Sequence, residues 1–280
     1  MARDGDSPEG RSVRRLFIPG SLADTVTLTG SDAHHLGYTL RARVGERCVV
    51  VDAERQVATM EIVGFTADTV SLRLIEKLAA DTEPPIQLTL AVCLLKSDKM
   101  EFVVQKAVEL GATKVQPLES ENCVARYDEK KAAARRERWQ RIADEAAKQC
   151  GRTALLTVAP ILPFGEWITA RPAADGAAFF CYEKEQDATL GAFLSGTQAD
   201  AYTALIGPEG GFAPAEAKAA IRAGVAAVTL GPRILRAETA AVAAMTIVQH
   251  VKGDLGNMPS PLGALCAGVQ WTPREVAAEG

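Results

Sequence analysis

The chain has 280 residues, which is enough for one large domain or two. Apolar residues make up 48% and charged residues 24%, a balance typical of globular proteins. No apolar run reaches the roughly 18 residues of a membrane span, and residues 1–10 are too polar for a secretory signal; we therefore expect a cytoplasmic protein with no membrane partner. The net charge of −4 does not indicate a nucleic-acid partner, but local patches could still bind one.

Residues 13–80 read as a β-rich region, preceded by a flexible N-terminus over residues 1–12. Short runs rich in valine and isoleucine predict strands over 46–53, 57–65 and 69–78. One helix interrupts them, with Ser31 and Asp32 as its expected cap. Short strands at this spacing suggest a small barrel.

The pattern changes at residues 81–85, where two prolines in a polar stretch predict a linker. Beyond it, up to residue 256, strands and helices alternate, which favours a mostly parallel sheet with helices on both faces. The predicted strands cover 86–95, 114–118, 178–182, 202–206 and 225–230, and the predicted helices 98–110, 130–149, 214–222 and 235–251. The remaining residues, 257–280, read as a loosely held tail.

Two glycine-proline turns are the most informative feature of this second region. Leu205-Ile206-Gly207-Pro208-Glu209-Gly210-Gly211 ends one apolar run, and Leu230-Gly231-Pro232 ends another. Each is followed by an alanine-rich helical segment. Glycine lets a ligand approach the backbone closely, and ligands of open α/β sheets bind at the carboxyl ends of the strands. Two such turns would offer backbone amides and carbonyls to one ligand, although each alone could be purely structural.

Several kinds of chemistry find no support in the sequence. The first turn matches neither common phosphate-binding loop, so a nucleotide triphosphate is disfavoured, whereas a neutral adenosine remains possible. There is no G-x-S-x-G elbow of a hydrolase. The six cysteines form no C-x-x-C pair, and the three histidines form no metal motif, so we expect no metal.

Three polar residues, Arg236, Glu238 and Thr239, open an otherwise apolar helix after the second turn. The helix dipole favours an acidic residue there, which accounts for Glu238. The same dipole disfavours Arg236. A ligand or a carboxylate partner would explain why an arginine occupies this position.

In combination these segments resemble the RsmE family, the ribosomal RNA small-subunit uracil-N3 methyltransferases of the SPOUT superfamily. The resemblance runs from about residue 14 to residue 256. It is carried by residues 15–17, 34–36 with Arg41, 99–101, 105–111, 145–152, and the two turns with 235–240.

The resemblance implies a PUA-like β-barrel for RNA over residues 13–80 and an α/β domain with a deep trefoil knot over residues 86–256. It also implies S-adenosylmethionine as the cofactor and a homodimer as the assembly. The implied reaction methylates N3 of one uridine in the 16S ribosomal RNA of the small ribosomal subunit. That nitrogen must lose its proton to attack, so the enzyme must orient both substrates, accept a proton and stabilise charge on the uracil oxygens.

The resemblance also assigns roles to individual residues. Arg236 would face the uracil oxygens or the acidic group that orients it, and Glu209 and Glu238 are both candidate proton acceptors. The expected cofactor-binding residues are Leu205, Gly207, Pro208, Glu209, Gly210, Gly211, Leu230, Gly231, Leu235 and Thr239. The expected phosphate contacts are Arg15, Arg41, Lys96, Lys106 and Arg152.

Two other interpretations stay open. One is an RNA-binding or assembly factor that has kept the fold without catalysis, against which the presence of both Arg236 and Glu238 speaks. The other is an unrelated nucleotide-binding α/β protein, against which the missing phosphate loop speaks.

Overall fold

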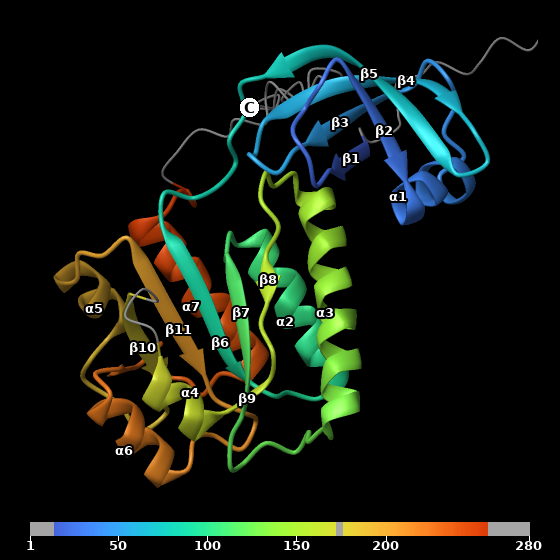
Figure 1. Ribbon diagram of the computed structural model, residues 1–280. Coiled ribbons are helices and arrows are strands. Elements are labelled where there is room, and N and C mark those ends of the chain that lie inside the picture. Colours follow the sequence, from blue (N-terminus) through green and yellow to red (C-terminus); the bar gives the residue numbers. More distant parts are fainter. Residues whose placement is uncertain (1–13, 172–175, 257–280) are drawn as a thin grey trace, which may run out of the picture. The chain divides into compact units, whose positions relative to one another are not determined.

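The computed structural model describes residues 14–171 and 176–256 (Figure 1). The predicted flexible N-terminus and tail lie outside these ranges. The chain divides into two compact units between residues 82 and 83, inside the stretch predicted as a linker. Within the described ranges, no helix is both long and apolar enough to cross a bilayer.

The first unit is a five-stranded sheet with one short helical segment. Its elements are β1 (Arg14–Phe17), β2 (Thr25–Thr29), α1 (Gly30–His34), a π-helical turn η1 (His35–Thr39), β3 (Arg47–Val51), β4 (Val57–Phe65) and β5 (Thr69–Leu78). The strand order is β1-β3-β4-β5-β2, with β1 parallel to β3 and the other pairs antiparallel. Among the described residues no ladder joins β1 to β2, so the pairing does not close the sheet.

Alternating side chains of these strands form the core of the first unit. Leu16, Leu36, Met60, Ile62 and Leu72 are nearly or fully buried in one cluster. The helix does not begin where the sequence predicted. Its N-cap is Thr29, and Asp32 lies in the first turn, where an acidic side chain is favourable to the helix dipole.

The second unit is an α/β domain. Its elements are β6 (Gln87–Cys93), α2 (Ser97–Glu109), β7 (Lys114–Glu119), α3 (Glu129–Cys150), β8 (Thr157–Val158), β9 (Leu162–Pro163), α4 (Phe164–Ala170), β10 (Ala177–Cys181), α5 (Leu190–Gly196), β11 (Ala201–Ile206), α6 (Pro214–Arg222), β12 (Ala226–Val228) and α7 (Ala237–Lys252).

Every strand pair of this second sheet is parallel. The order is β12-β10-β11-β6-β7-β8, and β9 also pairs with β7. The central strands β6 and β11 are almost entirely buried, as expected for a parallel sheet covered on both faces. Helices α2, α5 and α7 pack together, with α7 against β6 and β11, whereas α4 packs against α6 and β7 (Figure 1). The carboxyl ends of β10, β11 and β12 therefore open at one edge of the sheet.

Candidate active site

The first of the two turns, residues 207–211, follows β11 directly. The amide of Gly211 donates to the carbonyl of Pro208 at 2.9 Å, and Gly211 adopts a φ of +71° that favours glycine. Gly207 lies under the ring of Phe212, where a Cβ would come within 3.0 Å of a ring carbon. The glycines are therefore required by the conformation of the turn and by its packing.

The second turn, residues 231–236, follows β12. Thr229 just before it pairs with Thr189 and exchanges hydrogen bonds of 3.2 Å with the amide and carbonyl of Gly231. Gly231 has a φ of +117°. The turn ends at Arg236, which has an extended backbone and is the N-cap residue of α7.

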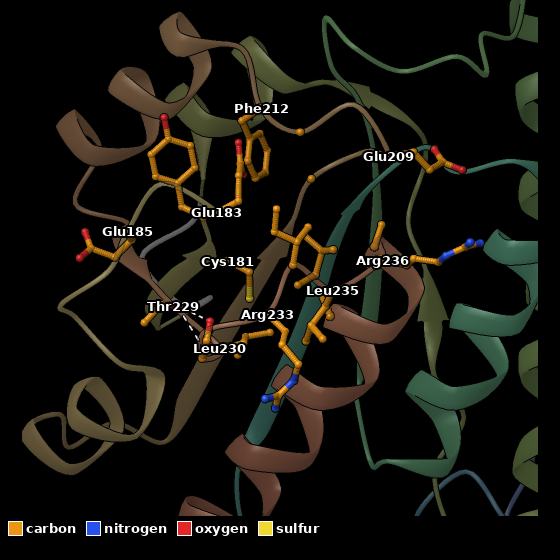
Figure 2. A pocket seen from close by; sticks show the side chains of 18 of the residues that line it. Cys181, Glu183, Glu185, Glu209, Phe212, Thr229, Leu230, Arg233, Leu235 and Arg236 are labelled. Atoms are coloured by element: carbon orange, nitrogen blue, oxygen red, sulfur yellow. Dashed lines mark hydrogen bonds between the residues drawn. The ribbon is translucent and has the colours of Figure 1, made fainter.

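Both turns line a single cavity of about 910 Å³ (Figure 2). The third wall comes from Cys181, the last residue of β10, and from Glu183 and Glu185 just after it. A volume near the upper end of small-molecule sites, with backbone groups on two sides, suits a ligand as large as a nucleoside with a substituent. Apolar side chains of Ile206, Phe212, Leu230, Ile234 and Leu235 also line it.

A lysine between two glutamates holds the charged side of the site together. The ammonium of Lys99, at the start of α2, lies 3.4 Å from a carboxylate oxygen of Glu209 and 3.4 Å from one of Glu238. The backbone amide of Lys96 also donates to Glu209 at 3.4 Å. Side-chain exposure is only about one fifth for all three residues of this cluster. Glu238 Oε2 is fully buried and accepts no hydrogen bond in the described structure, so Lys99 is its only close charged neighbour.

Arg236 contrasts with this cluster. Its side chain is exposed and lines the cavity, and in Figure 2 it lies on the same side as Glu209, away from Glu185. Within the described ranges its guanidinium makes no hydrogen bond or ion pair. Of the two explanations offered by the sequence, a carboxylate partner within the described chain is therefore wrong, and a ligand remains.

The thiol of Cys181 at the cavity wall is not a nucleophile. Desolvation by the surrounding protein raises its pKa to about 12, so the group is a neutral thiol at neutral pH. It contributes an apolar surface to the cavity.

Most residues predicted to bind a cofactor line the cavity, and two do not. Those that do are Gly207, Pro208, Glu209, Gly210, Gly211, Leu230, Gly231 and Leu235. Leu205 is fully buried inside β11, where side chains alternate between faces, and so it supports the sheet. Thr239 lies in the first turn of α7, outside the lining residues. Of the three predicted catalytic residues, Arg236 and Glu209 line the cavity, whereas Glu238 lies behind Lys99.

The residues predicted to contact phosphate differ in their exposure and in their partners. Arg41 and Lys96 are exposed, and the ammonium of Lys106 is held by Glu109 at 2.7 Å. Arg15 and Arg152 are buried. The guanidinium of Arg152 binds the carboxylate of Glu83, also nearly buried, and the carbonyls of Val108 and Ala112. A phosphate cannot reach it, so the prediction for Arg152 is wrong, and the same burial argues against Arg15.

The sequence did not single out several residues that line the cavity. Glu183 and Glu185 follow β10, and Thr229 follows β12. Their position directly after a parallel strand is the available signal, but it required knowing that β10 lies beside β11. Lys99 stood in the quoted resemblance without a role, because its two carboxylate partners are more than 100 positions away in sequence.

Comparisons with known proteins agree with this geometry. A family model described as an RNA methyltransferase domain matches residues 82–249. The chain is 36% identical over 222 residues to the ribosomal RNA small subunit methyltransferase E of Synechocystis sp., covering 79% of this chain and 71% of that protein. The protein of that name from Bacillus subtilis is 31% identical over 240 residues, covering 83% and 94%. A structure of the Neisseria gonorrhoeae protein of that name, bound to S-adenosyl methionine, is 33% identical with a TM-score of 0.78, covering 87% of this chain and 99% of that one.

Proposed function

The chain belongs to the ribosomal RNA small subunit methyltransferase E family, and we propose that it methylates N3 of one specific uridine in 16S ribosomal RNA. The observation that carries this proposal is the cavity itself. Two glycine-proline turns, separated in sequence by α6 and β12, meet there, at the carboxyl edge of an all-parallel sheet. Relatives solved with S-adenosylmethionine share the fold.

The lining of the cavity fits S-adenosylmethionine. Leu230, Leu235 and Phe212 offer apolar surface for an adenine ring, and the free backbone groups of the second turn offer donors and acceptors for its edge. The carboxylates of the exposed Glu183 and the half-buried Glu185 add negative charge, which suits a cationic ligand. When bound, this cofactor supplies an activated methyl group on a sulfonium, so the chain itself need supply no metal.

The remaining tasks fall to the charged residues beside the second turn. Arg236 presents a guanidinium with no partner among the described residues, and we assign it to the oxygens that flank N3 of the uracil. A positive group there stabilises the charge that develops when N3 loses its proton. Glu209 lines the cavity and Glu238 does not, so Glu209 is the better placed proton acceptor. Lys99 then holds Glu209 in position, with Glu238 as its second anchor.

The family pattern adds three structural proposals. The first unit is a PUA-like RNA-binding domain over residues 13–80, joined by a linker at 81–85. The second is a SPOUT domain with a deep trefoil knot over residues 86–256. The protein is a homodimer whose interface lies beside the site. The side chain of Ile234 on the second turn is 88% exposed, and a partner subunit would cover this apolar surface. Light scattering during size exclusion tests the dimer.

One experiment tests the proposed function directly. The full chain and S-adenosylmethionine with a labelled methyl group are incubated with small ribosomal subunits from a strain that lacks this activity. We expect one labelled uridine in 16S ribosomal RNA, with the label on N3 by mass spectrometry of the nucleoside. Calorimetry with S-adenosylmethionine serves as the control. Heat of binding without transfer would identify a protein that has lost catalysis, and no heat at all would reject the proposal.

A further inference from the structure

A second cavity, of about 390 Å³, lies wholly within the first unit. We name it the hairpin pocket, because one side is the tip of the β4–β5 hairpin and the other is the α1–η1 segment. Its lining residues are Gly30, Ala33, His34, Gly37, Tyr38, Ala42, Phe65, Thr66, Ala67, Asp68, Thr69 and Val70. None of them belongs to the active site described above.

Three aromatic side chains, His34, Tyr38 and Phe65, line the hairpin pocket. The ring of Tyr38 stacks on the imidazole of His34, with 4.8 Å between centroids and 24° between planes. Tyr38 is nevertheless 66% exposed, and Phe65 on the hairpin is 38% exposed. Gly37 lies beside the Phe65 ring, where a Cβ would be in van der Waals contact with it at 3.8 Å. Exposed rings gathered around a hollow are typical of a binding site rather than of a core.

The backbone beside these rings is unusual in two respects. Residues 35–39 form a π-helical turn, a rare conformation that is frequent at functional sites. Arg41, two residues later, has a φ of +49°, which is uncommon for a side chain other than glycine, asparagine or aspartate. The amide of Ala42 donates to the carbonyl of Leu36 at 3.0 Å and so fixes this conformation. Such strain persists where the structure holds residues in place for binding.

The polar groups at the rim suit a planar, hydrogen-bonding ligand attached to a negative chain. Asp68 at the hairpin tip has a carboxylate that makes no bond within the described structure, while Thr66 and Thr69 bond to each other at 2.8 Å and hold the tip rigid. Arg41 and Arg43 flank the pocket-lining Ala42, and both guanidiniums are exposed and without an ion pair in the described ranges. Rings, an acceptor and free cations together match a nucleotide.

We propose that the hairpin pocket binds one unpaired nucleobase of the RNA, stacked on Tyr38 and bounded by Phe65. The choice of RNA as ligand rests on the proposed function. Bases inside a duplex are stacked on each other and cannot enter, so the pocket selects single-stranded segments. The carboxylate of Asp68 accepts hydrogen bonds but cannot donate them, so it favours a base with an exocyclic amino group, adenine, cytosine or guanine, over uracil, whose only base donor is N3–H.

The test measures binding of the full chain to labelled homopolymer oligoribonucleotides of adenine, cytosine or uracil, and to a matched duplex. Loss of one base–aromatic stack predicts that Tyr38→Ala weakens single-strand binding by at least about fivefold. Tyr38→Phe keeps the ring and should bind as the unmodified chain does. Val44→Ala is the matched control, because Val44 is 62% exposed and lies outside the pocket. Asp68→Asn should remove the preference for adenine and cytosine.

The outcomes separate this inference from the proposed function. A Tyr38→Ala chain that binds RNA as well as Val44→Ala does, equal binding of duplex and single strands, or no RNA binding by the unmodified chain would each overturn the nucleobase site. Methyl transfer measured in parallel addresses the other proposal. Transfer with an unchanged KM in Tyr38→Ala rejects only the hairpin pocket, whereas Tyr38-dependent binding without any transfer by the unmodified chain rejects only the enzymatic function.

Discussion

The two glycine-proline turns that line the active site differ in how firmly the protein holds them. The first turn is anchored from several directions: Asn122 donates to the carbonyl of Gly211 at 3.0 Å, and Phe212 is buried behind it. The second turn is open. Nothing lies within 4 Å of where a Cβ on Gly231 would be, and Ile234 is 88% exposed. Within the described ranges the backbone of residues 232–235 makes no hydrogen bond.

This difference indicates that the two turns contribute to ligand binding in different ways. A preformed wall lowers the entropy cost of binding, and the first turn supplies it. The free amides and carbonyls of the second turn must find partners when the cavity closes around a ligand. We therefore expect ligand binding to order the second turn much more than the first. Changes in the first turn should mainly affect stability, and changes in the second mainly affinity and transfer.

The largest expected effect is at the end of the second turn. Arg236→Ala should lower kcat/KM for methyl transfer to small subunits by about 10²–10³-fold, or about 2.7–4 kcal/mol, because a preorganised positive group is lost. Unfolding by urea should be unchanged, since the side chain is exposed and has no partner in the described structure. The kcat/KM of Arg236→Lys should lie between those of the unmodified chain and Arg236→Ala, because lysine keeps the positive charge but lacks the planar guanidinium. Arg222→Ala, at the exposed end of α6, is the control. Full activity in Arg236→Ala would remove this residue from the mechanism.

The second largest effect is expected in the support of the first turn. The Glu216 carboxylate accepts from the amides of Glu121 at 2.9 Å and Ala213 at 3.0 Å, and so ties the exit of the turn to the loop after β7. Glu216→Ala removes two charge-assisted bonds and should lower the free energy of unfolding by about 1.5–3 kcal/mol. Lys218→Ala, on the same helix, is the control and should leave the free energy of unfolding unchanged. If the two variants unfold at the same urea concentration, the first turn is not anchored in this way.

Local sequence patterns predicted the strands and helices whose own residues have a clear propensity or a favoured end residue. The structure confirms β4 and β5 over their full length, and α6 from Pro214, a favoured first-turn residue, to Arg222. Local sequence patterns did not predict α4, α5, β1, β2, β8 or β9. These elements are short, and β1 exists through parallel pairing with β3, more than 30 residues away. Propensity within a short window does not contain that information.

The candidate active site could likewise be predicted only where its residues carry a local signal. The two turns could be brought together from sequence because each has its own glycine-proline signature at a strand end. The Lys99 cluster could not, because each of its charges is ordinary by itself. The prediction for Arg152 was wrong for the opposite reason. An arginine in a resembling motif suggests a phosphate contact, but its carboxylate partner, Glu83, stands before the first strand of the domain.

A smaller effect is expected from the backbone of the first turn. Gly211→Ala places a side chain at a φ of +71° and brings a Cβ to 3.2 Å from a carboxylate oxygen of Glu183. The left-handed conformation costs about 1–2 kcal/mol, and the packed turn cannot relax to avoid it. Gly231 also has a positive φ, but the space around it is open, so in Gly231→Ala the turn can shift to relieve the strain. Urea unfolding should therefore show a larger loss for Gly211→Ala, and equal losses would contradict the contrast between the turns.

The smallest effect tests the anchor of the second turn. Thr229→Val keeps the shape of the side chain but removes the hydrogen bonds that link its hydroxyl to Gly231. Because the groups released can bond to water, the free energy of unfolding should change by less than about 1 kcal/mol. Affinity for S-adenosylmethionine should nevertheless fall several-fold, since a looser turn must lose more conformational freedom on binding. Calorimetry with Thr169→Val as control, an exposed site on α4, measures this difference. An unchanged affinity together with a large loss of stability would mean that the second turn is a structural element like the first.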